Sequence, residues 1–351
     1  MKYTFLCKGK KPAVTGRGTV AVIGAGPAGL AAAGALACNG YDVDVYDKLL
    51  YPGGLMTFAI PPYRVPREHV EEGVEDLKQN FGVNFRLGVK VFCNEEVRHD
   101  EGDAFVHGVV DLRDLVEDYD GVIITTGTWR SRRLWIPGEW SEGVFSALEY
   151  LFRIWTYEQK LSTVPPPNPQ KVVVIGGGLS AIDATEESLR RGIKEVYLVY
   201  RRTADYAPAG KSEIERMKKL GANFIELAQP VEVLRERGRI TGVKFVRMKL
   251  GEPDSSGRPR PIPIEGSEFV IEAGALIAAI GELPTPPVEK ECLGIKTDKR
   301  GRILVDENYN AGHPKIYAAG DVRVGPSKIG TALSDGMKAA LAFHRNFMKS
   351  K

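Results

Sequence analysis

The sequence predicts an α/β fold made of two Rossmann-like domains, the second inserted into a discontinuous first. A strand, a glycine turn, a helix and a second strand follow one another from Val20 to Asp47. The same order recurs from Lys171 to Arg202, which indicates an internal repeat at the level of domains. The 351 residues also exceed the length at which a single hydrophobic core usually splits into two.

The first glycine turn has the pattern of a dinucleotide-binding site. Gly24 allows the tight turn after the strand, Gly26 leaves room for a pyrophosphate, and Gly29 lets the helix pack close to the strand. The N–H groups at the start of that helix face the phosphates. Asp47 follows Gly29 by eighteen residues, where a ribose-binding carboxylate is expected. The alternative is an ordinary glycine-rich turn, against which the strand, helix and acid all argue.

The second glycine turn, Gly176 to Ala181, reads GGGLSA, and its last residue stands where a third glycine is usual. The next strand, Val196 to Tyr200, ends without a carboxylate and continues into Arg201 and Arg202. Because guanidinium groups present forked donors to a phosphate, the second nucleotide is predicted to be NADP(H). The alternative, that the two arginines are only a solvated strand end, stays open because Asp205 lies nearby.

The remaining segments place the domain boundaries. Two apolar strands end in glycine, one at Gly127 and one at Gly281, and each closes one nucleotide-binding unit. The chain then finishes with a strand ending at Gly320 and Asp321 and a long helix from about Ile329. If this strand and helix complete the first domain, the second domain must be inserted between the two parts of the first. We therefore predict one domain over 1–134 and 284–351 and the inserted domain over 135–283.

Further elements are expected between these landmarks, at Tyr51 to Glu68 (a functional loop), Glu68 to Phe81 (helix), Val83 to Val91 (strands), Ser146 to Lys160 (helix), Lys211 to Leu220 (helix), Val231 to Leu250 (strands) and Ala275 to Ile280 (strand).

Composition excludes several classes of function. The net charge of +3 is too small to predict nucleic-acid binding, and the basic residues Lys8, Lys10 and Lys11 are expected to be a solvated arm. The apolar stretches have the length of strands and are broken by glycine, so no membrane span is predicted. The first residues lack the apolar region of a signal peptide, which favours a cytoplasmic protein.

Cysteine and histidine spacing predicts neither a metal site nor a catalytic disulfide. Cys7, Cys38, Cys93 and Cys292 are widely scattered, with no CxxC pair and no iron-sulfur ligand spacing. The five histidines show no metal-site pattern. Isolated buried thiols are therefore the expectation for the cysteines.

The ordered motifs GAGPAGLAAA, GGLMTFAIPPYRVPR, TGTWRSRRLWIPGE, VFSALEYL, VVVIGGGLSAIDA, VYRRT, AIGELP and IYAAGDV resemble one enzyme group. The chain, from about Lys11 to its end, resembles the NADPH-dependent flavoproteins of the glutamate synthase small-subunit group. That resemblance implies FAD in the discontinuous domain and NADPH in the inserted one. It also departs from the group, whose full-length members carry a cysteine-rich N-terminal region for iron-sulfur clusters; only Cys7 precedes the first strand here.

The resemblance also implies residue roles. Gly24, Gly26, Ala28 and Asp47 would hold the FAD pyrophosphate and ribose, and Val91 would meet the adenine through its backbone. The flavin ring would contact Gly53, Gly54 and Leu55, and its ribityl chain would contact Gly320 and Asp321. The pyrimidine edge of the flavin would lie at the helix start near Thr331, where the helix dipole stabilises the negative charge of reduced flavin. Gly176, Gly178, Leu179, Ser180, Arg201 and Arg202 would hold NADPH, and the further expected cofactor contacts are Pro27, Gly29, Lys48, Thr126, Gly127 and Gly281.

The predicted function is that of an oxidoreductase that takes a hydride from NADPH and passes electrons from FAD to a partner protein, a large subunit or a small acceptor. Hydride transfer needs no acid or base, so no catalytic residue is named. Two alternatives stay open at this point. One is a free-standing reductase of a quinone, sulfur or disulfide substrate, and the other is a non-catalytic redox-sensing subunit. The natural acceptor, the oligomeric state and the strictness of the NADPH preference are not predicted from the sequence.

Overall fold

The structure, a computed structural model, describes residues 4–5, 14–94, 99–254 and 257–350. Cys7 and the basic residues Lys8, Lys10 and Lys11 lie outside these ranges. The chain forms two units, the first from residues 1–130 and 282–351 and the second from residues 131–281. The chain thus crosses between units at 130/131 and 281/282, where the sequence led us to expect 134/135 and 283/284.

The first unit is built on a parallel five-stranded sheet with the strand order β18-β6-β1-β2-β3. Because β1 has β2 on one side and β6 on the other, the chain changes direction across the sheet beside β1, and ligands of such sheets bind at the carboxyl ends of the strands near that point. The sheet strands are β1 (Thr19–Ile23), β2 (Asp42–Asp47), β3 (Asn84–Leu87), β6 (Gly121–Ile124) and β18 (Ile316–Ala318).

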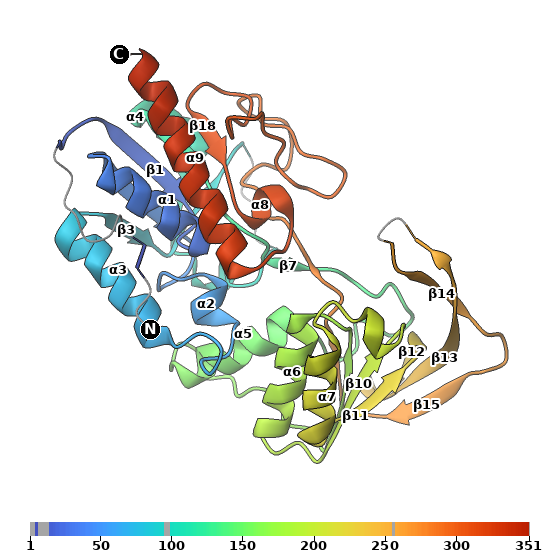
Figure 1. Ribbon diagram of the computed structural model, residues 1–351. Coiled ribbons are helices and arrows are strands. Elements are labelled where there is room, and N and C mark those ends of the chain that lie inside the picture. The colour runs from blue at the N-terminus through green and yellow to red at the C-terminus, as the bar shows by residue number, and fades with distance from the viewer. Residues whose placement is uncertain (1–3, 6–13, 95–98, 255–256, 351) are drawn as a thin grey trace. The chain divides into compact units, whose positions relative to one another are not determined.

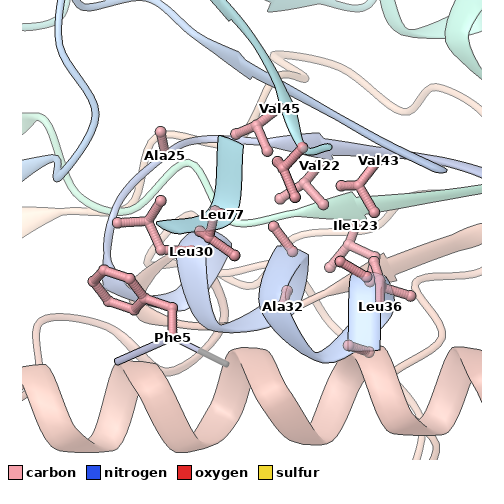
Figure 2. Packing of buried hydrophobic residues seen from close by; sticks show 14 of the residues in the cluster. Phe5, Val22, Ala25, Leu30, Ala32, Leu36, Val43, Val45, Leu77 and Ile123 are labelled. Atoms are coloured by element: carbon pink, nitrogen blue, oxygen red, sulfur yellow. The ribbon is translucent and has the colours of Figure 1, made fainter. Parts of the chain in front are cut away.

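Helices cover both faces of this sheet, and alternate residues of each strand separate two cores. Val20 and Val22 of β1 belong to one hydrophobic cluster, while Ala21 and Ile23 belong to the other. Figure 2 shows the first cluster, in which Val22, Val43, Val45 and Ile123 of the sheet pack with Leu30 and Leu36. The helices are α1 (Pro27–Cys38), α2 (Leu55–Phe58), α3 (Arg67–Phe81), α4 (Leu112–Asp118), α8 (Asp321–Val324) and α9 (Ile329–Ser350), and α1 lies beside α9 (Figure 1).

A second, smaller sheet of the first unit was not predicted. Its strands β4 (Val89–Phe92) and β5 (Gly108–Asp111) run parallel, and the short helix η1 (Asp103–Phe105) lies between them in sequence. The sequence indicated strands only near the first of these, because β5 is too short to show a clear alternation. This small sheet contributes one wall of the site described below.

The second unit repeats the parallel arrangement with the order β11-β10-β9-β16-β8. Its strands are β8 (Val144–Ser146), β9 (Lys171–Ile175), β10 (Glu195–Tyr200), β11 (Asn223–Glu226) and β16 (Ala275–Ala278), and its helices are α5 (Ala147–Glu158), α6 (Leu179–Arg190), η2 (Ala204–Tyr206) and α7 (Lys211–Lys219). Ser146 caps α5 by accepting a hydrogen bond from the backbone N–H of Glu149, which explains where that helix begins.

An antiparallel sheet completes the second unit. It contains β12 (Ala228–Glu236), β13 (Arg239–Pro253), β14 (Pro259–Pro263) and β15 (Phe269–Glu272), with β13 paired to each of the others. The short strands β7 (Arg130–Ser131) and β17 (Glu282–Leu283) lie where the chain crosses between the units. The sequence indicated β structure from Val231 to Leu250, which matches β12 and most of β13.

Candidate functional site

Two of the three glycines in the first turn are required by the fold itself. Gly24 has a φ of +104°, and a Cβ atom there would lie 2.5 Å from the backbone oxygen of Thr125. A Cβ atom on Gly29 would overlap the backbone oxygen of Gly24, because α1 packs tightly on the turn. Gly24 therefore lets the turn pass close to the end of β6, and Gly29 lets α1 pack on the turn.

Gly26 is different, because nothing within the described protein requires a glycine there. Its φ of −76° suits any residue, and a Cβ atom on it would have no atom within 4 Å. It caps the start of α1 without a side-chain hydrogen bond, so the first N–H groups of the helix face open space. A bare backbone beside open space at a helix start fits a bound pyrophosphate.

Two pockets lie at the carboxyl ends of β1, β2 and β6, with Gly24, Asp47, Thr126 and Trp129 in the walls of both. The larger one, which we name the phosphate pocket, has an empty volume of about 640 Å³, part of it open to solvent. It is lined by the expected residues Gly26, Pro27, Ala28, Gly54, Leu55, Gly127 and Asp321. The second, which we name the adenosine pocket, has about 460 Å³ and is lined by Lys48 and Val91. The two pockets are adjacent, because they share the four residues named above.

Asp47 ends β2 at the boundary of the two pockets. Its carboxylate accepts hydrogen bonds from the N–H groups of Ala25, at 2.6 Å, and Leu49, at 2.8 Å. Burial raises the pKa of Asp47, against the opposing effect of these donors and of Lys48. The two backbone donors fix the carboxylate in place, where its remaining lone pairs can accept from a ribose hydroxyl.

Thr126 gives independent evidence that a ligand fits here. Its hydroxyl oxygen is buried and has no hydrogen-bond partner among the described residues, although Thr126 lines both pockets. Buried polar atoms in native proteins are almost always hydrogen-bonded, so this hydroxyl calls for a partner from outside the chain. The residues present therefore fit a bound FAD.

Four expected contacts of the first unit do not line either pocket. Gly29 packs on the turn as described, and the N–H of Gly53 donates to the backbone oxygen of Ala25 at 2.7 Å. The N–H of Gly320 donates to the carboxylate of Asp335 at 2.8 Å. Thr331 is exposed in the first turn of α9, although its neighbour Ile329 lines the phosphate pocket. Gly29, Gly53 and Gly320 thus support the residues around the pockets without lining the pockets themselves.

A network of buried charges forms one side of the adenosine pocket and was not predicted. The ammonium of Lys48 lies 3.1 Å from Asp103 and 5.0 Å from the centre of the Trp129 ring. Lys90 lies 2.6 Å from Asp103 and 3.2 Å from Asp100. Burial lowers the pKa of Lys48, while the pKa of Asp103 is lowered by Lys48 and Lys90 although its own burial acts to raise it.

Replacing Asp103 with alanine is expected to destabilise the first unit strongly. The change leaves buried Lys48 without its ion-pair partner, which costs about 3 kcal/mol. Thermal unfolding should show a midpoint lower by about 6 to 12 °C. The control is Glu142→Ala, which removes an exposed ion pair with Arg239 and should move the midpoint by less than about 2 °C. Equal midpoints for the two variants would contradict this account.

The second unit has the same two kinds of glycine. Gly176 has a φ of +146°, and a Cβ atom there would overlap the backbone oxygen of Ala279. Gly178 has a φ of −92° and no atom within 4 Å of the position of a Cβ atom. Ala181, in the third position, is fully buried. Gly178 caps α6 without a side-chain hydrogen bond, and the following Leu179 is 42% exposed, so this helix start also faces open space.

The two predicted phosphate-binding arginines differ in their surroundings. Arg201 is exposed and makes no hydrogen bond or ion pair with the described part of the chain. Arg202 is only 1% exposed; it donates to the backbone oxygen of Pro259 at 2.7 Å and to the carboxylate of Asp254 at 2.6 Å. Arg202 therefore ties the end of β10 to the segment between β13 and β14, and Arg201 is the available cation.

The structure also places the other expected residues of the second unit. Asp205, which left the solvated-end alternative open, pairs with Lys211 at 2.8 Å, so its charge is compensated. Ser180 is the second residue of α6. Gly281 has a φ of +104° and its oxygen accepts from the N–H of Arg132 at 2.9 Å.

The expectation of isolated buried thiols was wrong. Cys93 and Cys292 form a disulfide across a sequence separation of 199 residues, and Cys38 is also disulfide-bonded. Residues so far apart in the chain carry no spacing signal, because only the fold of the first unit brings them together. Across the described ranges, no group of three or more histidines, cysteines or acids could hold a metal ion. Within the same ranges, no helix is long and apolar enough to cross a membrane.

Comparisons with known proteins agree with this geometry. The family described as pyridine nucleotide-disulphide oxidoreductase matches residues 18–336. The glutamate synthase [NADPH] small chain of Halomonas elongata is 36% identical over 91% of this chain and 66% of its own length. The NADP(+)-dependent formate dehydrogenase subunit beta of Moorella thermoacetica is 36% identical over 94% of this chain and 44% of its own length. The chain thus spans only part of each relative.

A solved structure shows the same fold. Mycobacterium tuberculosis FprA in complex with NADPH superposes with a TM-score of 0.77, over 95% of this chain and 85% of its own, at 21% identity. The predicted α/β fold with two Rossmann-like domains and the predicted resemblance to the glutamate synthase small subunit are therefore confirmed.

Proposed function

The chain belongs to the pyridine nucleotide-disulphide oxidoreductase family, as a flavoprotein oxidoreductase whose cofactors are FAD and NADPH, and we propose that it passes electrons from NADPH through FAD to a partner protein or a small acceptor. FAD supplies the hydride-accepting chemistry, because it can take two electrons together and release them one at a time. The protein holds the two cofactors and stabilises their charges.

The observation that carries this proposal is the pair of glycines with open space beside them. Gly26 and Gly178 each stand at a helix start, and each has a φ that any residue accepts. A Cβ atom at either position would have no other atom within 4 Å. The fold does not need glycine at either place. A phosphate-bearing ligand does, because its oxygens must approach the backbone N–H groups.

We assign FAD to the first unit and NADPH to the second. In the first unit, Gly26 would face the pyrophosphate, Asp47 the ribose and Val91 the adenine. Thr126 would satisfy its buried hydroxyl on the ligand. The start of α9 would stabilise negative charge on the reduced flavin, since Ile329 lines the phosphate pocket. In the second unit, Arg201 would bind the 2′-phosphate of NADPH.

We propose no catalytic side chain. Hydride transfer between two cofactors requires alignment and exclusion of water, and no proton has to move to or from the protein. We also infer a cytoplasmic location, which the use of NADPH supports. Disulfides are rare in the cytosol, but Cys93 and Cys292 are both less than 10% exposed, so cellular thiols have little access to this bond once it has formed.

The purified chain is expected to oxidise NADPH with an artificial acceptor but to make no glutamate. Purified protein should contain FAD by extraction and chromatography, and it should reduce ferricyanide when NADPH is added. Given glutamine and 2-oxoglutarate instead, it should release no glutamate, because that reaction needs an amidotransferase and an FMN site, whereas we assign the two units to FAD and NADPH. FMN in place of FAD, or glutamate formation by the isolated chain, would contradict the proposal.

A further inference from the structure

The disulfide between Cys93 and Cys292 joins the two separate pieces of the first unit. Cys93 directly follows β4, on the piece that ends at residue 130. Cys292 lies on the piece that begins at residue 282, and the 199 residues of separation include the whole second unit. The bond therefore closes a loop around the inserted unit without involving any residue of it.

The surroundings of the disulfide are buried and belong to both pieces. Cys93 pairs with Val288 as an isolated parallel bridge, and Cys292 pairs with Ile295. Both cysteines belong to the hydrophobic cluster that contains Leu112, on the first piece, and Ile303, on the second. Cys93 is 3% exposed and Cys292 is 6% exposed. The bond thus lies inside the core at the junction of the two pieces.

The adenosine pocket is built across the same junction. Val89, Lys90 and Val91 line it from β4, just before Cys93. Thr285, Pro286 and Pro287 line it from the second piece, just before Val288 and Cys292. Hydrogen bonds and one ion pair also hold this second wall. The N–H of Thr285 donates to the backbone oxygen of Gly127 at 3.0 Å, and the Thr285 hydroxyl donates to the same oxygen at 3.2 Å and accepts from the N–H of Trp129 at 3.4 Å. Glu289 forms a half-exposed ion pair with Arg130.

We propose that the Cys93–Cys292 disulfide is a covalent staple that closes the split first unit around the adenosine end of its FAD. Without it, the wall at Thr285 to Pro287 depends on the non-covalent contacts above and on apolar packing. A covalent link restricts opening of that wall and restricts the unfolded chain, whose loop closure is costly for a loop this long. The effect on FAD retention rests on the proposed FAD site, whereas the effect on stability does not.

The chemistry of reduction defines how the staple is removed. A dithiol such as dithiothreitol donates two electrons and two protons, the S–S bond breaks, and two thiols and an oxidised dithiol result. Because both sulfur atoms are buried, exchange in the folded protein should be slow. The bond therefore acts as a lasting element of the fold.

The first test asks whether the bond exists. Protein unfolded in the presence of an alkylating reagent, without a reductant, should yield a peptide pair linked through Cys93 and Cys292 in mass spectrometry. Alkylated Cys93 and Cys292 in that sample would overturn the proposal. Limited proteolysis within the second unit gives a second measurement. On a denaturing gel, the cleaved chain should migrate as one band without reductant and as two bands with it.

The second test compares Cys93→Ser/Cys292→Ser with the control Cys38→Ser, which removes a disulfide at the end of α1, away from both pockets. The double variant should release FAD about tenfold faster and unfold at least about 5 °C lower. The control should retain FAD as the unaltered protein does. Unchanged FAD release and unfolding in the double variant would overturn the staple.

If the double variant does not fold, the Cys38→Ser protein provides the same comparison after incubation with dithiothreitol until alkylation shows that Cys93 and Cys292 are reduced. A lowered unfolding midpoint in protein that never contains FAD would support the staple while contradicting the proposed cofactor site, so the two failures are distinguishable.

Discussion

Replacing Gly26 with valine is expected to lower FAD affinity by about 100-fold, which corresponds to about 2.7 kcal/mol. The backbone at Gly26 is extended, with a φ of −76° and a ψ of −176°, so valine fits it without strain. Its side chain would fill the open space that we assign to the pyrophosphate. FAD affinity would be measured by reconstituting the apoprotein and following flavin fluorescence.

Gly178→Val is the matched control, because it makes the same change at the corresponding place in the second unit. It should leave FAD affinity unchanged and raise the KM for NADPH by a similar factor. Gly26→Val should instead lower FAD affinity and, once it is saturated with FAD, show an unchanged KM for NADPH. If both variants weaken the binding of the same cofactor, the assignment of FAD to one unit and NADPH to the other is wrong.

Replacing Arg201 with alanine should remove most of the preference for NADPH over NADH. A charge-assisted hydrogen bond to the 2′-phosphate is worth about 1.5 to 3 kcal/mol, so kcat/KM for NADPH should fall by about tenfold or more, mainly through KM. The value for NADH should barely change. Steady-state kinetics with both coenzymes measure this, and equal use of both by the unaltered enzyme would contradict the assignment.

Arg202→Ala should behave differently from Arg201→Ala. Because Arg202 is buried and bonded to Asp254 and Pro259, its loss should lower the unfolding midpoint as well as coenzyme binding. Arg201→Ala should leave the midpoint unchanged, since its side chain is exposed. A stable Arg202→Ala protein with only a coenzyme defect would show that Arg202 acts mainly on the ligand.

Local sequence patterns predicted the parts of the site that depend on neighbouring residues. The spacing of Gly24, Gly26 and Gly29 follows from the geometry of one strand, one turn and one helix, and Asp47 follows from the length of the next strand. The same reasoning located Gly176 and Gly178. The strand, turn and helix are local and so leave a pattern in the sequence, whereas the close approach of Gly24 to Thr125 and of Gly176 to Ala279 joins distant segments.

The sequence did not predict the parts that form between distant segments. Thr285 to Pro287 reach the adenosine pocket only because the chain returns to the first unit after the second, and Trp129 closes the pocket from just before the crossing. The pairing of Cys93 with Cys292 has the same origin. The two neighbouring arginines look alike in the sequence, but only Arg202 lies under the segment that carries Asp254 and Pro259.

An anaerobic titration of the FAD-loaded protein with NADPH tests directly whether electrons pass from NADPH to the flavin. The proposal predicts that the flavin absorbance bleaches in proportion to NADPH added, close to one equivalent for each FAD, and that the colour returns when ferricyanide is added. A protein that holds FAD fully yet keeps its flavin colour with excess NADPH would contradict electron transfer and would leave a sensing role as the better account.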